Sequence, residues 1–237
     1  MTNFQWRIEQ DARDAALARG EEIAKLNRFS AGPVDPFRVI ASEGGQIHAE
    51  GDDFRDCFDG RLSYHDGRFL LIYNIRYNAW SHSGTHHPKV RFTVAHELGH
   101  YYLDPHREFL VNRRKPIESF TEFESNKQVE READAFAAGL LMPEYLVAPR
   151  INRQTQASTA SIKQVAKEFD VSLTSMMVRW TQLSDFPCAT LCIRNEHILR
   201  AESARLHSIV IKCMAFRFRF VIGTQRVDRF AFRLVNS

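Results

Sequence analysis

Residues 91–100 read RFTVAHELGH, and no other stretch of this 237-residue chain says as much about its architecture. The last five residues form an HExxH motif, in which His96 and His100 stand four positions apart. Side chains at that spacing lie one turn apart on the same face of a helix, so two imidazoles can bind one metal ion. The motif therefore predicts a metal-binding helix from about Lys89 to Leu103.

Glu97 follows the first histidine, where its carboxylate can take a proton from a water molecule that the metal activates. The alternative interpretation is a pair of surface histidines on an amphipathic helix. Val90, Val94 and Leu98 argue against it, because they give the helix an apolar side that should pack into the core. Zn²⁺ is the expected ion, and Mn²⁺ and Fe²⁺ stay alternatives because metal selectivity depends on geometry and availability.

A catalytic zinc ion needs a third protein ligand, and Glu130 is the favoured candidate. Glu130 and Asp134 are four residues apart in a second predicted helix, so they share one face of it. Glu130 can complete the metal site while Asp134 hydrogen-bonds the free ring nitrogen of a ligating histidine. The alternative interpretation of Glu130 is an exposed charge that pairs with Lys127.

Three other side chains compete with Glu130 for this role. His106 stands at the ligand position of HExxHxxGxxH proteases, but Leu103 occupies the place of the glycine, where a positive φ would be unfavourable. Asp104 directly follows that same residue. Glu132 lies on the predicted helix of Glu130, but it would face another way. These alternatives remain open from the residues alone.

The segments before the motif predict helices and strands. Apolar residues recur at helical spacing from about Phe4 to Leu26. Asp35-Pro36 is typical of an N-cap and a first turn, and Gly44-Gly45 would end that short helix. Asp66-Gly67, between the predicted strands 62–65 and 68–73, is the signal of an antiparallel hairpin. The expected fold class is α+β with a small antiparallel sheet.

Asp104-Pro105 is expected to stop the motif helix, and residues 107–125 look irregular. A further helix, which carries Glu130, should run from about Asn126 to Met142. The polar stretch 152–161 is typical of a linker. We therefore expect a metallopeptidase domain over residues 1–152.

Residues 153–186 predict a helix-turn-helix segment, with helices over 162–169 and 172–180. Direct DNA binding is not the favoured role, because the second helix offers only Arg179 as a strong cation and DNA affinity depends on Lys and Arg. Residues 187–237 form the third predicted part, which is short and β-rich. Its predicted strands are 189–193, 208–211 and 216–220.

Taken together, these motifs resemble the ImmA/IrrE metallopeptidases. The similarity covers about residues 10–150 and is carried by RFTVAHELGH (91–100), EREADAFAAGLLMP (130–143), VDPF (34–37) and DGRLSY (59–64). The resemblance implies a zincin-like fold, with His96, His100 and Glu130 as zinc ligands and Glu97 as the base.

The resemblance also implies a function. Members of this family are intracellular endopeptidases that cleave a helix-turn-helix transcriptional repressor and so switch on stress-response or mobile-element genes. IrrE-like members add a helix-turn-helix segment and a GAF-like domain. The last part of this chain is short for such a domain, which implies a reduced GAF-like domain or a truncation.

The composition agrees with a globular protein, with 44% hydrophobic and 26% charged residues. No apolar run approaches the roughly 20 residues that span a bilayer, and the first residues lack the pattern of a signal peptide. The expected location is therefore the cytoplasm, without a membrane partner. Four cysteines without a CxxC pair are too few for a disulfide framework, and they indicate reduced, buried thiols.

One different class of function remains, a non-enzymatic metal-containing transcriptional regulator that binds DNA or a repressor. A missing base or a closed site of four ligands would favour it, whereas this sequence keeps Glu97 and offers three good ligands. The sequence does not choose the group that stabilises the oxyanion of the reaction. The candidates for that role are Tyr64, His65, His82, His86 and His87.

Overall fold

The computed structural model describes residues 3–80, 86–112, 127–151 and 158–184, and the strand segments 189–194, 197–203, 209–214 and 217–222. The chain forms two compact units. The first comprises residues 1–147 and 166–172, and the second comprises residues 148–165 and 173–237. The division expected from the sequence, at residues 152 and 186, stays a prediction.

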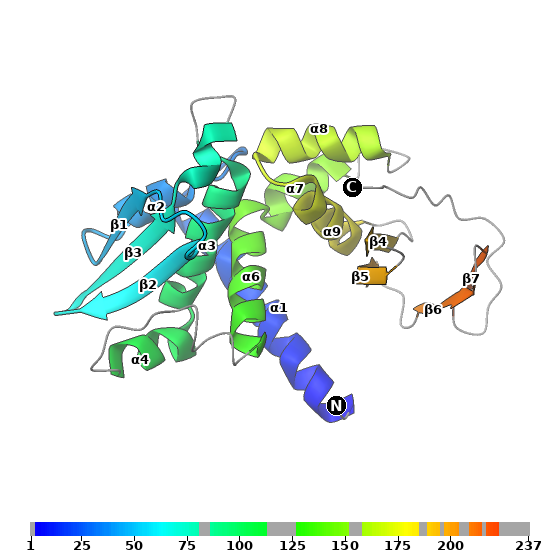
Figure 1. The fold of residues 1–237 in the computed structure, drawn as a ribbon, viewed down its shortest axis with the longest axis horizontal. Coiled ribbons are helices and arrows are strands. Elements are labelled where there is room, and N and C mark those ends of the chain that lie inside the picture. The colour runs from blue at the N-terminus through cyan, green and yellow to red at the C-terminus, as the bar shows by residue number, and fades with distance from the viewer. Residues whose placement is uncertain are drawn as a thin grey trace. The chain divides into compact units, whose positions relative to one another are not determined.

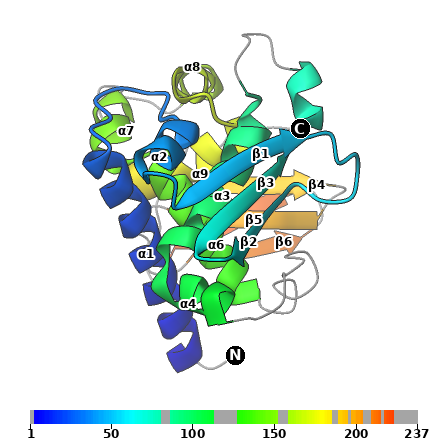
Figure 2. The same cartoon turned by 90° about the vertical axis from the view of Figure 1, so that its left-hand side faces the viewer.

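Helices of the first unit surround the HExxH motif. Over the described residues they are α1 (Asn3–Leu26), α2 (Pro36–Ser42), α3 (Pro88–Tyr102), α4 (Asp104–Asn112) and α6 (Lys127–Leu141), with a 3-10 turn, η1, over Arg76–Trp80. The motif helix α3 lies between a small sheet and α6, and α1 packs along α6 (Figures 1 and 2). The site is therefore built between the sheet and two packed helices.

Local signals in the sequence account for the helix boundaries. The side chain of Asp35 accepts a hydrogen bond of 3.0 Å from the backbone N–H of Phe37, which confirms the predicted N-cap of α2. Helix α3 begins with Pro88, at a position where the missing N–H costs nothing. Val90, Val94 and Leu98 are each no more than 1% exposed, so the predicted apolar side of α3 is confirmed.

The sheet contains β1 (Ile47–Asp52), β2 (Gly60–His65) and β3 (Arg68–Asn74) in the order β1-β3-β2. Strands β2 and β3 form the predicted antiparallel hairpin, and both turn residues have a positive φ, 48° at Asp66 and 86° at Gly67. Strand β1 pairs with β3 in parallel, so the prediction of an antiparallel sheet is wrong and the sheet is mixed. Strand β3 is central, and its Phe69 and Leu71 are buried, whereas Leu70 and Ile72 are part-exposed.

The expected end of the motif helix is confirmed, because α3 ends at Tyr102 and Leu103 is extended. Two other expectations are corrected. A new helix, α4, begins at Asp104 and places Pro105 in its first turn, where proline is tolerated. Residues 107–112 are therefore helical, while the rest of the segment expected to be irregular lies outside the described residues. Cys57 is exposed, so the prediction of buried thiols is wrong for this cysteine.

Helices α7 (Glu144–Ile151) and α8 (Thr159–Phe169) each have residues in both units. Helix α8 includes the end of the predicted linker, whose residues 152–157 lie outside the described ones. Helices α8 and α9 (Leu173–Leu183) occur where the helix-turn-helix segment is predicted, but that motif itself stays a prediction.

The second unit also holds two antiparallel strand pairs. Strand β4 (Ala189–Arg194) pairs with β5 (His197–Ser203), and β6 (Ile209–Met214) pairs with β7 (Arg217–Ile222). Helix α9 packs against β4 and β5. A reduced GAF-like domain stays a prediction. Among the described residues, no helix combines the length and the apolar character that crossing a membrane requires.

Candidate metal centre

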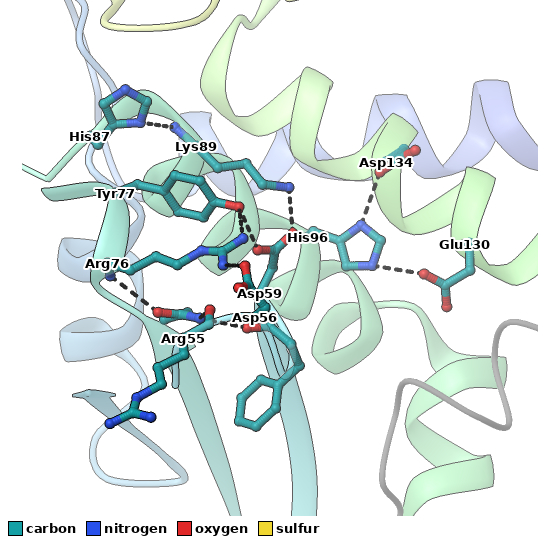
Figure 3. A network of polar contacts seen from close by, with 12 residues as sticks. Arg55, Asp56, Asp59, Arg76, Tyr77, His87, Lys89, His96, Glu130 and Asp134 are labelled. Carbon is teal, nitrogen blue, oxygen red and sulfur yellow. Dashed lines mark hydrogen bonds and ion pairs between the residues drawn. The ribbon is translucent and has the colours of Figure 1, made fainter. Parts of the chain in front are cut away.

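Three side chains from α3 and α6 direct donor atoms at one point. The Nε2 atoms of His96 and His100 lie 3.2 Å apart. Oε2 of Glu130 lies 3.2 Å from Nε2 of His96 (Figure 3). Oε1 of Glu130 lies 3.7 Å from Nε2 of His100. Donors that surround a tetrahedral zinc ion at 2.0–2.1 Å are themselves about 3.3 Å apart. The cluster therefore has the donor types and the size of a three-ligand zinc site.

Small residues allow α3 and α6 to come this close. A Cβ atom on Gly99 would lie 3.1 Å from Cα of Ala133 and 3.2 Å from its carbonyl oxygen, which is nearer than packed side chains normally approach. Gly99 directly precedes His100 in α3, and Ala133 is one turn from Glu130 in α6. Close contact of the two backbones therefore sets the distance between the imidazoles and the carboxylate.

Glu97 projects into the same place from α3. It is only 5% exposed, and its Oε2 atom has no hydrogen-bond partner among the described residues. Burial raises the pKa of Glu97 to about 7, with a further rise from the charge of Glu130 and opposing effects of His96 and Arg61. A carboxyl group with this pKa can both accept and release a proton near neutral pH.

Gly60, the first residue of β2, faces Glu97 across the site. A Cβ atom at this position would lie 2.9 Å from Oε1 of Glu97 and 2.4 Å from Cγ2 of Thr93. The second distance is far inside van der Waals contact, so a larger residue would force α3 or its side chains to move. The absence of a side chain at Gly60 therefore gives Glu97 its room.

Each motif histidine has a partner at its outer ring nitrogen. Nδ1 of His96 lies 3.0 Å from Oδ1 of Asp134 (Figure 3). Nδ1 of His100 lies 3.1 Å from Nδ1 of His106, and Nε2 of His106 lies 3.1 Å from Oε2 of Glu132. His106 and Glu132 are thus on the side of His100 that faces away from Glu130.

The surroundings shift the pKa values of the two motif histidines in opposite directions. Burial lowers the pKa of His96, but hydrogen bonds to Asp134 and Glu130 and the charge of Glu97 outweigh this effect and raise it to about 10. Burial and the charges of His96 and His106 hold the pKa of His100 well below its usual value. The cluster therefore concentrates negative charge around His96, which favours a cation.

The cluster opens into a cleft of about 250 Å³. Its walls include residues that sequence reasoning missed, namely Asp59, Gly60, Lys89, Phe92 and Thr93. Nζ of Lys89 forms an ion pair of 2.8 Å with Oδ2 of Asp59 (Figure 3). Thr93, Phe92 and Lys89 precede His96 in α3 by three, four and seven residues, so they lie on the same helix face as His96. Helical spacing could therefore have indicated these three residues.

The described candidates for oxyanion stabilisation lie elsewhere. Tyr64, His65, His86 and His87 are described, and none of these four is among the residues that line the cleft. His86 instead stacks on Phe37 at a ring distance of 4.3 Å. His82 lies outside the described residues. Asp104, one of the alternative ligands, is exposed at the start of α4 and is not part of the cluster.

Comparison with known proteins adds two findings. The model of peptidase family M78, described as the IrrE N-terminal-like domain, matches residues 55–181. A solved Mycobacterium tuberculosis transcriptional regulator has a similar fold, with a TM-score of 0.54, 13% sequence identity, and an alignment that covers 82% of this chain. The chain spans 59% of the length of that regulator. No curated protein matches the sequence.

Proposed function

We propose that this chain, which belongs to the M78 peptidase family with its IrrE N-terminal-like domain, is a zinc-dependent endopeptidase with Glu97 as the general base. One observation carries the proposal. The donor atoms of His96, His100 and Glu130 lie within 4.8 Å of one another, beside a buried carboxylate oxygen of Glu97 without a hydrogen-bond partner among the described residues. Three protein ligands with an adjacent base are typical of a catalytic zinc site.

The residues fit a zinc ion in donor type and in spacing. His96, His100 and Glu130 would hold it, and the ion, when bound, would supply Lewis acidity and lower the pKa of a water molecule in the cleft. The Oε2 atom of Glu97 is available for that water molecule, because it has no hydrogen-bond partner among the described residues.

The protein's own groups then move the protons. Glu97 takes a proton from the water molecule as the water oxygen attacks the carbonyl carbon of the scissile peptide bond. The C–N bond breaks, and Glu97 returns the proton to the leaving amine nitrogen. Burial raises the pKa of Glu97 in the metal-free protein, which supports a carboxyl group that exchanges its proton near neutral pH.

The proposed substrate is a helix-turn-helix transcriptional repressor, whose cleavage would derepress stress-response or mobile-element genes. This part rests on the resemblance to the ImmA/IrrE metallopeptidases. The regulator of similar fold supports the architecture alone, since its identity to this chain is 13%. A cleft rather than an enclosed cavity is compatible with a polypeptide substrate that enters from outside.

Incubation of the purified chain with candidate repressors, with and without a chelator, tests the proposal. We expect cleavage that the chelator abolishes and added Zn²⁺ restores. Glu97→Gln should keep the bound metal and lose cleavage by a factor of about 10² or more, because general base catalysis contributes on that scale. Full cleavage by this variant would remove Glu97 from the mechanism. DNA binding that ignores the chelator, without cleavage, would support the non-enzymatic regulator.

A further inference from the structure

The outer ring nitrogen of His100 faces a second histidine. His106 reaches it from α4, and both rings are only 3% exposed. The contact joins the two Nδ1 atoms at 3.1 Å, so the Nε2 atom of His100 stays directed at His96 and Glu130. His106 is thus placed to act on His100 from behind.

The hydrogen-bond pattern behind His100 has one consistent assignment when Nε2 of His100 binds a cation. A ligating imidazole is neutral and keeps its proton on the other nitrogen. Nδ1–H of His100 then donates to Nδ1 of His106, which must carry its own proton on Nε2. That second proton is donated to Oε2 of Glu132, 3.1 Å away. Each contact has one donor and one acceptor, and neither ring is charged.

Glu132 is itself held in place. Its other oxygen, Oε1, accepts a hydrogen bond of 2.7 Å from Nε2 of Gln128, one turn earlier in α6. The same amide nitrogen lies 3.3 Å from the carbonyl oxygen of Glu9 in α1. The sequence of contacts therefore runs from His100 through His106 and Glu132 to a fixed point between two helices.

We propose that His106 and Glu132 form a positioning relay that fixes the tautomer and the ring orientation of His100 as a metal ligand. The inference rests on the metal site of the proposed function. It gives His106 a role that differs from direct coordination, which its place in the sequence had suggested. The relay acts through His100, so His106 and Glu132 are positioning residues.

Three substitutions at position 106 separate the two contacts. Asparagine can place Oδ1 where Nδ1 of the ring lies, so His106→Asn keeps an acceptor for His100. Glutamine can place Nε2 where the ring Nε2 lies, so His106→Gln keeps the contact with Glu132 and loses the one with His100. His106→Leu keeps the bulk and removes both contacts. Leu110→Ala, at another buried position of α4, is the matched packing control.

The readout is the affinity of the full chain for Zn²⁺, measured by competition with a chromophoric chelator. His106→Gln and His106→Leu should bind Zn²⁺ about 10- to 100-fold more weakly than the unaltered chain, as is typical when the hydrogen-bond partner of a ligand is lost. His106→Asn should lose clearly less. Leu110→Ala should lower the stability of the metal-free protein and leave the affinity unchanged. The d–d absorption of bound Co²⁺ should change in His106→Gln and stay the same in Leu110→Ala.

Two results would overturn the relay and leave the metal site in place. Equal affinity in His106→Gln and the unaltered chain is the first such result. If all four variants lost Zn²⁺ affinity in proportion to their loss of stability, His106 would be a packing residue only. If the unaltered chain bound no Zn²⁺ in the same titration, the metal site of the proposed function would fall, and the relay with it.

Discussion

His96 and His100 are the same residue type on the same helix, yet their outer ring nitrogens lie in different surroundings. The partner of His96 is Asp134, whose side chain is 58% exposed. The partner of His100 is His106, which is 3% exposed. Water can replace the first contact when it is lost, whereas the second lies in an environment from which water is excluded. The outer hydrogen bond of His96 is therefore open to water, whereas that of His100 is buried.

The difference has an energetic consequence. Asp134 is largely exposed, so solvent and salt screen its pair with His96, which contributes less to stability than a buried pair. A buried hydrogen bond gains more from its surroundings, and a buried donor that loses its acceptor costs about 1–3 kcal/mol. We expect the His100 side of the site to be the rigid one and the His96 side to be adjustable.

The largest effect should come from Gly60, because a side chain at this position would press on Glu97, the proposed base. Gly60→Ala would place a methyl group against Thr93 and Oε1 of Glu97. We expect cleavage of a repressor substrate to fall about 100-fold, the scale of general base catalysis, while Zn²⁺ affinity stays within a few fold. Parallel measurement of cleavage rate and metal affinity checks this prediction. An equal fall in both would mean that the methyl group disturbs the ligands and not the base.

The second prediction compares the loss of Glu132, behind His100, with the loss of Asp134, the partner of His96. Glu132→Ala leaves the buried Nε2–H of His106 without its acceptor, so the free energy of unfolding should fall by about 1–3 kcal/mol and Zn²⁺ affinity by about 10-fold or more. Asp134→Ala lets water take the place of the carboxylate, so its effect on stability should stay below about 1 kcal/mol. Urea unfolding with a chelator present, and chelator competition, measure the two quantities. A larger loss of stability in Asp134→Ala would reverse the comparison.

The smallest effect concerns His86, a part-buried histidine outside the site. Burial against Phe37 and Tyr73 holds its pKa below the usual value of 6.5; the charge of Asp35 opposes this effect, and the charge of Arg91 adds to it. The unfolded chain therefore takes up a proton first as the pH falls below 6.5, and the stability that the neutral ring provides is lost as the pH falls through the folded-state pKa. His86→Phe cannot take up this proton.

Unfolding of the metal-free protein between pH 7.5 and pH 5 is the measurement for His86, at pH values chosen to bracket the usual pKa of histidine at about 6.5. We expect the stability of His86→Phe to fall less steeply toward acid than that of the unaltered chain. Other buried histidines contribute in both proteins, so the difference between the two curves carries the result. Parallel curves would show that His86 does not titrate differently in the folded state.

Local patterns in the sequence determined much of the architecture. The four-residue spacing of the motif places two imidazoles on one helix face wherever that helix packs. The turn at Asp66-Gly67 requires a positive φ at two successive residues, which is a property of the chain itself. The N-cap at Asp35 is likewise local, because its partner is two residues away. The family expected from the paired motifs is also confirmed. Both motifs are short, continuous segments, so they can be recognised without knowledge of the fold.

Only the tertiary structure decided the features that join distant segments. The parallel pairing of β1 with β3, the room that Gly60 leaves for Glu97, and the place of His106 behind His100 each depend on how elements pack. Residue spacing presented His106 and Glu132 as competing ligands, because it measures distance along the chain and not the side from which a residue approaches. Packing of α4 and α6 brings them to the outer nitrogen of His100, where burial gives a hydrogen bond its strength.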